Sequence, residues 1–477
     1  MTIHDVDCFI DGGVVTATDT FDVIDPSTGK TLAAVSRGGP AQIDYAVEAA
    51  QSASKAWSRL AARDRADHLR AVGAAIAAQV DELAMLESRD TGKPLTQARV
   101  DAQVAVRYFE FYANAVEQFF GEVIPSMADV VAFTRHAPFG VTGHIIPWNY
   151  PMQIACRTFV PALAMGNCAV VKPAEDAPLS VLRIARIAAE AGLPPGVLNV
   201  VPGLGAEAGT ALAQHPGISH LSFTGSAPVG SIIAKAAAHN VIPVVLELGG
   251  KSPNIILADA DIAKAIPIVA KSILQNAGQT CSAGSRLLVR DSVHDQVVDR
   301  LAAHLAAVSI GPGPEDPDLG PLISEKQLRR VSDIVPDAAR RCDLRVGSTD
   351  PLDDRDGYFF APVLFDNVSP QETVAQEEVF GPVCAVSTFD DLDSAAAIAN
   401  GTTYGLIAAV WTSNINSALR LADDIVGSQV YVNTYGAGGG VEFPFGGFRK
   451  SGFGREKGFE TLRSFCQSKA VIIKVDQ

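Results

Sequence analysis

The chain has 477 residues, of which 48% are hydrophobic and 19% are charged, so it can bury large cores and is neither a disordered protein nor a coiled coil. Its formal net charge of −15 at pH 7 provides no positive surface for nucleic acid or for an anionic membrane. A chain of this length exceeds one ordinary core and predicts two or three domains whose partners are small molecules or other proteins.

The cysteines and the opening residues indicate a reducing compartment. The seven cysteines are odd in number and none stands in a CxxC or Cys/His ligand spacing, so we predict reduced thiols and no metal site. The opening "MTIHDVDCFIDGG" lacks the basic and apolar segments of a secretory signal. The nearly uncharged stretch 136–171 is interrupted by four prolines and fits a membrane span poorly. We expect a soluble cytoplasmic protein.

The N-terminal part of the chain has the periodicity of amphipathic helices. In 40–60 and again in 65–95 apolar residues recur at spacings of three and four. Gly92 and Pro94 end the second pattern. We therefore predict two helices ahead of any sheet.

From Val141 onward, short apolar runs alternate with helical segments. Strict alternation of strand and helix predicts a parallel sheet with helices on both faces, which is a doubly wound α/β fold. A second series of the same kind follows Glu247, and the pair Gly249-Gly250 is the natural break between the two. The predicted strands lie at 141–149, 168–174, 197–203, 220–225 and 241–250 in the first series, and at 252–259, 285–291, 405–412 and 428–433 in the second.

The last segment, "SKAVIIKVD", predicts a strand that has no partner near it in the sequence. Exposed terminal strands of this kind often pair with another subunit.

Two glycine-rich turns are candidates for nucleotide binding. In an open parallel sheet, ligands bind beyond the carboxyl ends of the strands, at helix N-termini. The stretch "VPGLGAEAG" contains Gly203, Gly205 and Gly209 in a GxGxxxG spacing, one residue longer than the usual dinucleotide fingerprint, and an ordinary strand-to-helix turn explains it equally well. The stretch "FTGSAPVG" places Ser226 before a predicted helix, which suits a pyrophosphate.

The stretch "VVKPAE" ends a predicted strand with Lys172, followed by Glu175. A lysine there can bind ribose hydroxyls, and the carboxylate can accept from the adenosine 2′-hydroxyl while repelling a 2′-phosphate. This arrangement favours NAD over NADP. The alternative is a surface salt pair at a helix start.

The stretch "NAGQTCSAGSR" surrounds Cys281 with small, flexible residues. Such flanks leave the sulfur accessible, and an accessible thiolate is a nucleophile candidate. Most free cysteines are instead buried small hydrophobes, which is what we expect of Cys156, Cys168 and Cys384.

A nucleophile needs a base and an oxyanion donor. Glu247 ends an apolar strand in "LELGGKSP", where burial should raise its pKa and make it a usable general base, unless the N–H groups of Gly249 and Gly250 satisfy it. Asn149 in "PWNYP" carries an amide that can donate to an oxyanion. No histidine has a comparable setting, which disfavours a Cys/His hydrolase.

Motifs along nearly the whole chain resemble those of the NAD(P)-dependent aldehyde dehydrogenase superfamily, in the same order. The sequence is most similar to the non-acylating branch that includes betaine-aldehyde-type enzymes. The motifs are "PWNYP", "VVKPAE", "FTGS", "LELGGKSP", "GQTCSAGSR", "EEVFGPV" and "PFGGFRKSGFGRE".

The resemblance implies a reaction and a role for each matching residue. The reaction is the oxidation of a small-molecule aldehyde to a carboxylic acid with NAD, through a thiohemiacetal and a thioester. Cys281 would be the nucleophile, Glu247 the base, and Asn149 with the Cys281 N–H the oxyanion hole. The implied cofactor contacts are Lys172 and Glu175 at the adenosine ribose, Gly205, Phe223 and Ser226 at the adenine and pyrophosphate, Ile145 and Trp148 along the groove, and Glu378 and Phe380 at the nicotinamide ribose and ring.

The resemblance also implies a division of the chain. Residues 1–118 and 138–249 would form a Rossmann-type cofactor domain, and 250–449 the catalytic domain. Residues 119–137 and 450–477 would form a β oligomerisation element with a C-terminal arm, in a homodimer or homotetramer.

One position bears on the substrate. Arg157 stands where many relatives have a large apolar residue lining the substrate tunnel. If its side chain enters the tunnel it can pair with the carboxylate of a semialdehyde. The alternative, which we favour from sequence, is a surface or interface arginine. The rival functions are a CoA-acylating aldehyde dehydrogenase and a catalytically silent protein with this fold.

Overall fold

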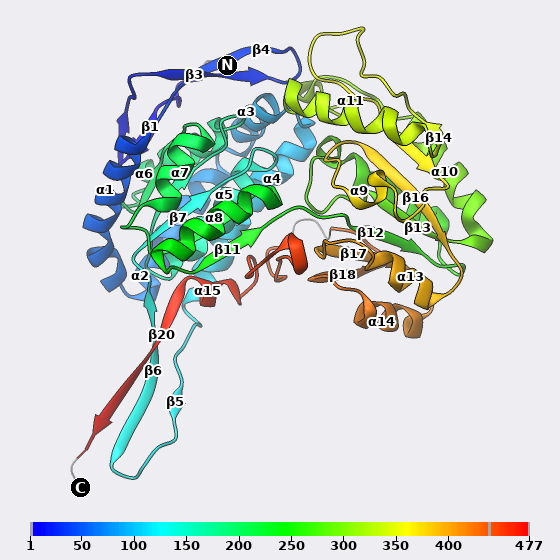
Figure 1. Cartoon of the computed structure of the whole chain (residues 1–477). Helices are drawn as coiled ribbons and strands as arrows, with labels where there is room; N and C mark the ends of the chain where they lie inside the picture. Colours follow the sequence, from blue (N-terminus) through cyan, green and yellow to red (C-terminus); the bar gives the residue numbers. More distant parts are fainter. Residues whose placement is uncertain (1–2, 437–439, 476–477) are drawn as a thin grey trace.

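In a computed structural model, which describes residues 3–436 and 440–475, the chain forms two α/β bodies and a projecting β arm (Figure 1). The first body contains an eight-stranded sheet with the strand order β19-β11-β10-β7-β8-β9-β1-β2. Its central strands are parallel, while β1, β2 and β19 run antiparallel to their neighbours. These strands are β1 (Cys8–Ile10), β2 (Gly13–Val15), β7 (Val141–Ile145), β8 (Cys168–Lys172), β9 (Leu198–Val200), β10 (His220–Thr224), β11 (Val244–Glu247) and β19 (Gly452–Phe453).

The second body contains a seven-stranded sheet with the order β14-β15-β16-β13-β12-β17-β18. All its pairings are parallel except that of the edge strand β14. These strands are β12 (Pro253–Ile256), β13 (Arg286–Arg290), β14 (Asp343–Val346), β15 (Val363–Asp366), β16 (Val383–Phe389), β17 (Ile407–Trp411) and β18 (Gln429–Val432). The predicted α/β class and both series of strands are confirmed, whereas the sequence analysis had not predicted β14, β15 and β16 of this sheet.

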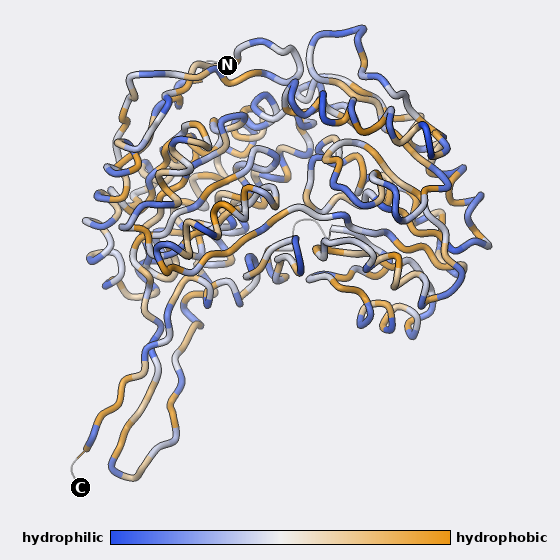
Figure 2. Tube along the Cα trace, viewed as in Figure 1, coloured by the Kyte–Doolittle hydropathy of each residue, from blue (hydrophilic) through white to orange (hydrophobic). Residues whose placement is uncertain are grey.

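Helices cover the faces of both sheets. In Figure 2 the strands inside the two bodies are largely hydrophobic and the outer helical turns carry the hydrophilic residues. The first body has α1 (Pro40–Arg59), α2 (Ala62–Ala77), α3 (Val80–Thr91), α4 (Leu95–Val116), α5 (Pro151–Ala164), α6 (Leu179–Glu190), α7 (Thr210–Gln214), α8 (Ala227–Asn240) and α15 (Thr461–Ser464). The second has α9 (Ile262–Leu274), α10 (His294–Ala306), α11 (Glu325–Ala339), α12 (Thr373–Gln376), α13 (Leu392–Ala399) and α14 (Ile415–Asp424).

The prediction of a single helix at 65–95 is wrong, because this segment forms two helices. The chain leaves the helical conformation at Gln79, with φ −121° and ψ 18°, and the segment divides into α2 and α3. The apolar periodicity continues across the break, which is why the sequence pattern does not reveal it. Gly92 does end α3, in the left-handed conformation at φ 79°.

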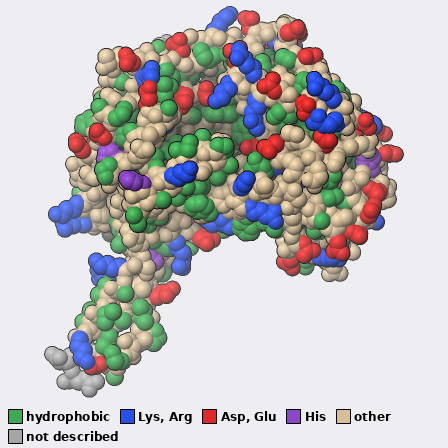
Figure 3. All heavy atoms as spheres, viewed as in Figure 1, with side chains coloured by type: hydrophobic (Ala, Val, Ile, Leu, Met, Phe, Trp, Pro, Cys, Tyr) green, Lys and Arg blue, Asp and Glu red, His purple; other side chains and the backbone are tan. Residues whose placement is uncertain are grey.

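A three-stranded sheet forms the arm that projects from the first body (Figure 1). β20 (Cys466–Lys474) pairs antiparallel with β6 (Val130–Pro138) along its whole length, and β5 (Val123–Ile124) pairs with the other edge of β6. Figure 3 shows hydrophobic side chains along the visible face of the arm, and Val123 and Ile472 are 82% and 72% exposed. The predicted terminal strand therefore has an intrachain partner, and its own outer edge has none among the described residues.

One stretch assigned from sequence to the arm belongs elsewhere. β19 lies within 450–477 but pairs with β11 in the eight-stranded sheet. The sequence suggests no strand there, because Gly452 and Phe453 show no apolar alternation.

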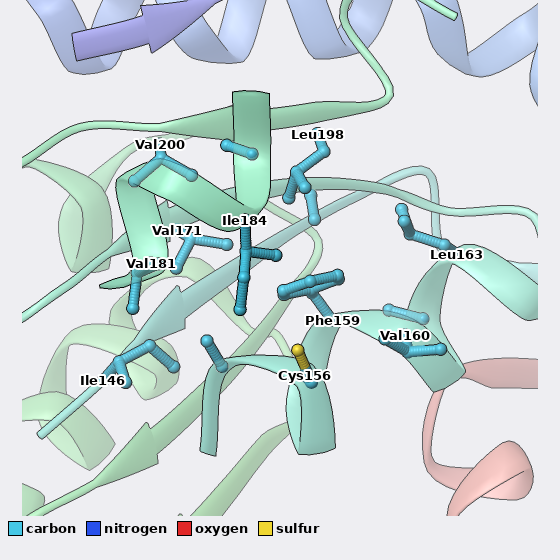
Figure 4. Packing of buried hydrophobic residues seen from close by; sticks show 14 of the residues in the cluster. Ile146, Cys156, Phe159, Val160, Leu163, Val171, Val181, Ile184, Leu198 and Val200 are labelled. Atoms are coloured by element: carbon cyan, nitrogen blue, oxygen red, sulfur yellow. The ribbon is translucent and has the colours of Figure 1, made fainter. Parts of the chain in front are cut away.

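The core of the first body packs α5 and α6 against the sheet. Figure 4 shows Phe159 of α5, Ile184 of α6 and Leu198 of β9 pointing into one space. Cys156 and Cys168 are fully buried in this core and Cys384 in the core of the second body, which confirms that these thiols are packing residues. Across 3–436 and 440–475, every helix is too short or too polar to cross a bilayer.

Two histidines lie inside the first body near the root of the arm. His144 of β7 and His220 of β10 are 0% and 1% exposed. The ring of Phe465, just before β20, lies 5.9 Å from the His144 ring centroid and 4.8 Å from that of His220. Burial lowers the pKa of each histidine to about 3. Both rings are therefore neutral in the native protein at neutral pH.

We predict that these histidines make the fold sensitive to acid. Their native pKa values lie below the unfolded value near 6.5, so the unfolded chain binds protons first as the pH falls through that value. Each histidine then costs about 1.4 kcal/mol of stability per pH unit. The urea midpoint of the wild type should fall more between pH 7.5 and pH 5 than that of His144→Gln. The exposed His239, changed to Gln, is the control, and equal pH dependence in all three proteins would contradict the prediction.

Candidate active site

The two sheets are joined by a short crossover, 248–252, that runs from β11 to β12 (Figure 1). The crossover has no room for side chains at two positions. A Cβ atom on Gly249 would lie 2.3 Å from Glu378 Oε2, and one on Gly250 would lie 2.5 Å from the carbonyl oxygen of Cys281. Both glycines therefore allow Glu378 and Cys281 to approach the chain that carries Glu247.

Cys281 follows a strained turn. Asn276 and Ala277 have φ values of 49° and 54°, and Gly278 has 73°, so three consecutive residues adopt the left-handed conformation that is uncommon without glycine. The Cys281 side chain is half-buried and packs against a cluster of Leu406, Ile407 and Phe445. The turn thus places the cysteine at the junction of the two sheets, which we call the seam, and leaves its side chain partly exposed.

The Cys281 thiol is protonated at neutral pH in this structure. Its pKa is raised to about 12, mainly by burial and also by Glu378 and Glu247, against Arg157 and Lys457, which lower it. The side chain is only half-buried, as the small flanking residues suggested, but the raised pKa favours the neutral thiol over the thiolate. The cause is desolvation by residues far away in the sequence, which the small flanking residues do not reveal.

Glu247 is the last residue of β11 and is 1% exposed. Neither carboxyl oxygen has a hydrogen-bond partner among the described residues. Gly250 donates its N–H to Glu378 Oε1 at 3.0 Å, so the Gly249-Gly250 N–H groups do not satisfy Glu247. Burial and then Glu456 raise the pKa of Glu247 well above its ordinary value, against the effect of Arg157, Arg455 and Lys457. A raised pKa of this kind is what a carboxyl needs to serve as a general base.

Asn149 lies between β7 and α5 and is 4% exposed. Its Nδ2 donates to the carbonyl oxygen of Gln279 at 3.0 Å, and its own carbonyl oxygen accepts from Asn276 Nδ2 at 2.9 Å. The asparagine is thus bound to the same turn that carries Cys281. One amide N–H is engaged and the amide has a second one to donate.

The residues expected at an adenosine ribose meet at the ends of β8 and β9. Lys172 Nζ donates to Glu175 Oε2 at 2.8 Å, and the Gly205 N–H donates to Glu175 Oε1 at 3.3 Å. Burial raises the pKa of Glu175, but Lys172 and the backbone N–H groups of Glu175 and Gly205 together outweigh it, and the net shift is downward. The ion pair foreseen as the alternative is present, and it leaves an ionised carboxylate between a lysine and a glycine turn.

The other expected cofactor residues form two groups. The rings of Trp148 and Phe380 meet edge to face with centroids 5.3 Å apart, and Glu378 lies on the same loop as Phe380, between α12 and β16. Ile145 and Phe223 are register partners on β7 and β10. Ser226 precedes α8 without capping it by its side chain. The structure therefore gathers the candidates at the carboxyl edge of the first sheet and along the seam.

Arg157 is neither at the surface nor available to a substrate carboxylate. Its side chain is buried and its Nε lies 2.5 Å from Glu456 Oε2. Its Nη2 donates to Thr224 Oγ1 at 3.3 Å, and its guanidinium carbon lies 5.3 Å from the centroid of the Phe445 ring. Both sequence interpretations of Arg157 are wrong, because the partner comes from the opposite end of the chain.

The sequence analysis did not identify Glu456 and Lys457 as site residues. Both are buried and both act electrostatically on Glu247, while Lys457 also acts on Cys281. The Lys457 Nζ lies 5.1 Å from the centroid of the Phe445 ring. The only available signal was two adjacent charges beside glycines in "GREKG", which by themselves suggest an exposed turn.

Comparison with known proteins gives one consistent family. A model described as "Aldehyde dehydrogenase family" matches residues 14–471. Human retinal dehydrogenase 2 is 40% identical over 465 residues, covering 96% of this chain and 89% of that protein. A crystal structure of a putative aldehyde dehydrogenase from Burkholderia cenocepacia superposes with a TM-score of 0.97 at 49% identity, covering 98% of this chain and all of the other. The indole-3-acetaldehyde dehydrogenase of P. syringae, solved with NAD+, has a TM-score of 0.97 at 37% identity, covering 100% of this chain and 97% of that one.

We predict that Arg157→Met destabilises the protein strongly, by about 3–5 kcal/mol, because it leaves Glu456 buried and uncompensated. Urea unfolding gives the measurement. The double variant Arg157→Met with Glu456→Gln should recover part of the loss, since the orphaned charge is gone. Arg341→Met, which breaks the surface pairs with Asp337 and Glu372, should leave the midpoint nearly unchanged. A midpoint for Arg157→Met equal to that of Arg341→Met would show that the buried pair does not matter.

Proposed function

Because the chain belongs to the aldehyde dehydrogenase family, we propose that it oxidises an aldehyde to a carboxylic acid with NAD, through a thioester on Cys281. The observation that carries this proposal is the convergence of Cys281, Glu247 and Asn149 at the crossover between the two sheets.

We assign NAD binding to the first body. The ionised Glu175, held by Lys172 and the Gly205 N–H, suits a ribose diol and repels a 2′-phosphate, which favours NAD over NADP. Gly205, Phe223 and Ser226 would border the adenosine end, and Ile145 and Trp148 the groove. Glu378 and Phe380 would hold the nicotinamide end. The P. syringae relative solved with NAD+ supports this assignment.

The proposed division of labour follows the sheets. Residues 1–118 and 138–249, with β19 added, form the cofactor domain, and 250–449 form the catalytic domain. Residues 119–137 with the rest of 450–477 form the arm. In this division Cys281 and Glu378 belong to the catalytic domain, and Glu247 and Asn149 belong to the cofactor domain. The site therefore needs both domains.

In the first half of the reaction, the Cys281 sulfur attacks the carbonyl carbon of the aldehyde. The carbonyl oxygen becomes an oxyanion, which the second amide N–H of Asn149 and the Cys281 N–H stabilise. The thiol proton leaves to solvent as the C–S bond forms, and the positive charges of Arg157 and Lys457 favour its loss. Bound NAD would supply the hydride acceptor, which Glu378 and Phe380 would hold at its nicotinamide end. Cys281 keeps the substrate carbon in place, and loss of hydride from that carbon leaves a thioester on its sulfur.

In the second half, Glu247 takes a proton from a water molecule whose oxygen attacks the thioester. The C–S bond breaks, the acid leaves and the thiol is restored. The buried, unpartnered carboxyl of Glu247 supports water as the acyl acceptor rather than CoA, because it can activate water beside the thioester.

We predict that Glu247→Gln separates the two halves. Hydride transfer should survive as a first-turnover burst of NADH, whereas steady-state turnover should fall by about 100-fold or more, since no base activates the water. Stopped-flow absorbance at the NADH band measures both phases. Cys281→Ala should bind NAD but form no NADH, so it gives the background absorbance for both phases. Equal losses in burst and steady state would contradict the role of Glu247.

We further propose that the arm joins subunits into a homodimer or homotetramer. Its sheet extends away from the body, its strand β20 is an edge, and large apolar side chains on it are exposed (Figure 3). A long exposed edge of this kind favours pairing with another chain.

Ile472→Glu should therefore reduce the mass of the assembly, because it places a charge on the apolar arm. Sedimentation velocity measures the mass. Ile415→Glu introduces the same charge at another exposed isoleucine, on α14, and should leave the mass unchanged. A monomeric wild type, or an Ile472→Glu protein of wild-type mass, would contradict the role of the arm.

A further inference from the structure

A fully buried cluster of charges lies outside the catalytic residues. Lys93 Nζ lies 3.1 Å from Glu87 Oε1 and 2.5 Å from Asp101 Oδ2, and the three side chains are 0–4% exposed. Glu87 lies on α3, Asp101 on α4, and Lys93 in the short link between them, after the left-handed turn at Gly92. A buried ion pair of this kind often costs as much desolvation energy as it returns, so stability alone is a weak explanation for three charges.

Each member of the cluster holds a different residue of the segment that follows Asn149. Lys93 Nζ lies 4.2 Å from the centroid of the Tyr150 ring. Glu87 Oε2 accepts from the Met152 N–H at 3.3 Å, and Asp101 Oδ1 accepts from Gln153 Nε2 at 3.1 Å. The cluster thus holds Tyr150, at the end of the loop, and Met152 and Gln153, in the first turn of α5.

The contact with Glu87 replaces a missing helix cap. α5 begins at Pro151, and Tyr150 at its N-cap position provides no capping side chain. The first-turn N–H of Met152 would otherwise be an unsatisfied buried donor. A carboxylate at a helix N-terminus is also favoured by the helix dipole. Glu87 therefore fixes where α5 starts, and with it the residue just before, Asn149.

The same helix α4 reaches the nucleophile turn. Gln97 Oε1 accepts from the Asn276 N–H at 2.9 Å, and Asn276 Nδ2 donates to the Asn149 carbonyl oxygen at 2.9 Å. The oxyanion loop and the cysteine turn are thus both tied to α4, which itself contributes no residue to the proposed chemistry.

We propose that Glu87, Lys93 and Asp101 are positioning residues, which act on the reaction by holding the Asn149–Gln153 segment against the cysteine turn. The inference rests on the proposed function of Asn149 and Cys281. Such a cluster can fix the positions of the reacting groups, and this matters because a displacement of about 1 Å in a reacting group can lower the rate about 100-fold. The ammonium of Lys93 stays charged, since Asp101 and Glu87 outweigh the effect of burial and raise its pKa. It therefore holds both carboxylates and the Tyr150 ring at once.

The central test is Lys93→Met, which keeps a long unbranched side chain at this position and removes its charge. We expect the first-turnover rate of NADH formation to fall by about 10-fold or more, with the NAD Kd within about twofold of the wild type. Amide hydrogen exchange in the peptide 148–156 should become faster. Lys264→Met, on the exposed face of α9, is the matched control and should behave as the wild type.

The outcomes separate the possible roles. A folded Lys93→Met protein with wild-type rate and wild-type exchange would overturn the proposal, as would one that loses only thermal stability while each folded molecule keeps its rate. If Lys93→Met does not fold, Gln153→Met tests the proposal instead, because it removes only the hydrogen bond from the Gln153 side-chain amide to Asp101. Wild-type rate and exchange in that variant would overturn the proposal, and slower turnover with faster exchange would support it. A wild type that forms no NADH with any aldehyde would count against the proposed function instead, and the exchange measurement would still test the positioning.

Discussion

The site depends on the close approach of two sheets through one short crossover. Because 248–252 must link β11 to β12 directly, Glu247 ends one sheet just where the other begins. The absence of side chains at Gly249 and Gly250 then allows Glu378 and Cys281 to lie against the crossover. A side chain at either position would push apart the groups that the proposed reaction needs within reach of one aldehyde.

Burial and charge act on this seam in opposite directions. Desolvation raises the pKa of both Cys281 and Glu247, which favours the uncharged form of each group. Arg157 and Lys457 provide a positive field, and Glu456 holds the Arg157 guanidinium in place. The same desolvation explains why a thiol next to small residues is not ionised.

Local patterns in the sequence were sufficient for most of the parallel strands and for the residues to which we assign chemistry. The alternation of strands and helices predicted both parallel sheets, and the motifs around Cys281, Glu247 and Asn149 brought together groups that the fold places at one seam. What the sequence could not reveal depends on partners far apart in the chain. The direction of Arg157 is set by Glu456, the division of α2 from α3 leaves the apolar period unbroken, and the cluster at Lys93 needs two helices to fold against each other.

The central claim is a covalent bond between one sulfur and the substrate. Mass spectrometry of the protein, quenched in acid within the first turnover after mixing with NAD and an aldehyde, tests it directly. The account predicts that the peptide containing Cys281 gains the mass of the acyl group, in an amount equal to the NADH formed in that turnover. NADH formation with no acyl mass on this peptide, or with the mass on another cysteine, would contradict it.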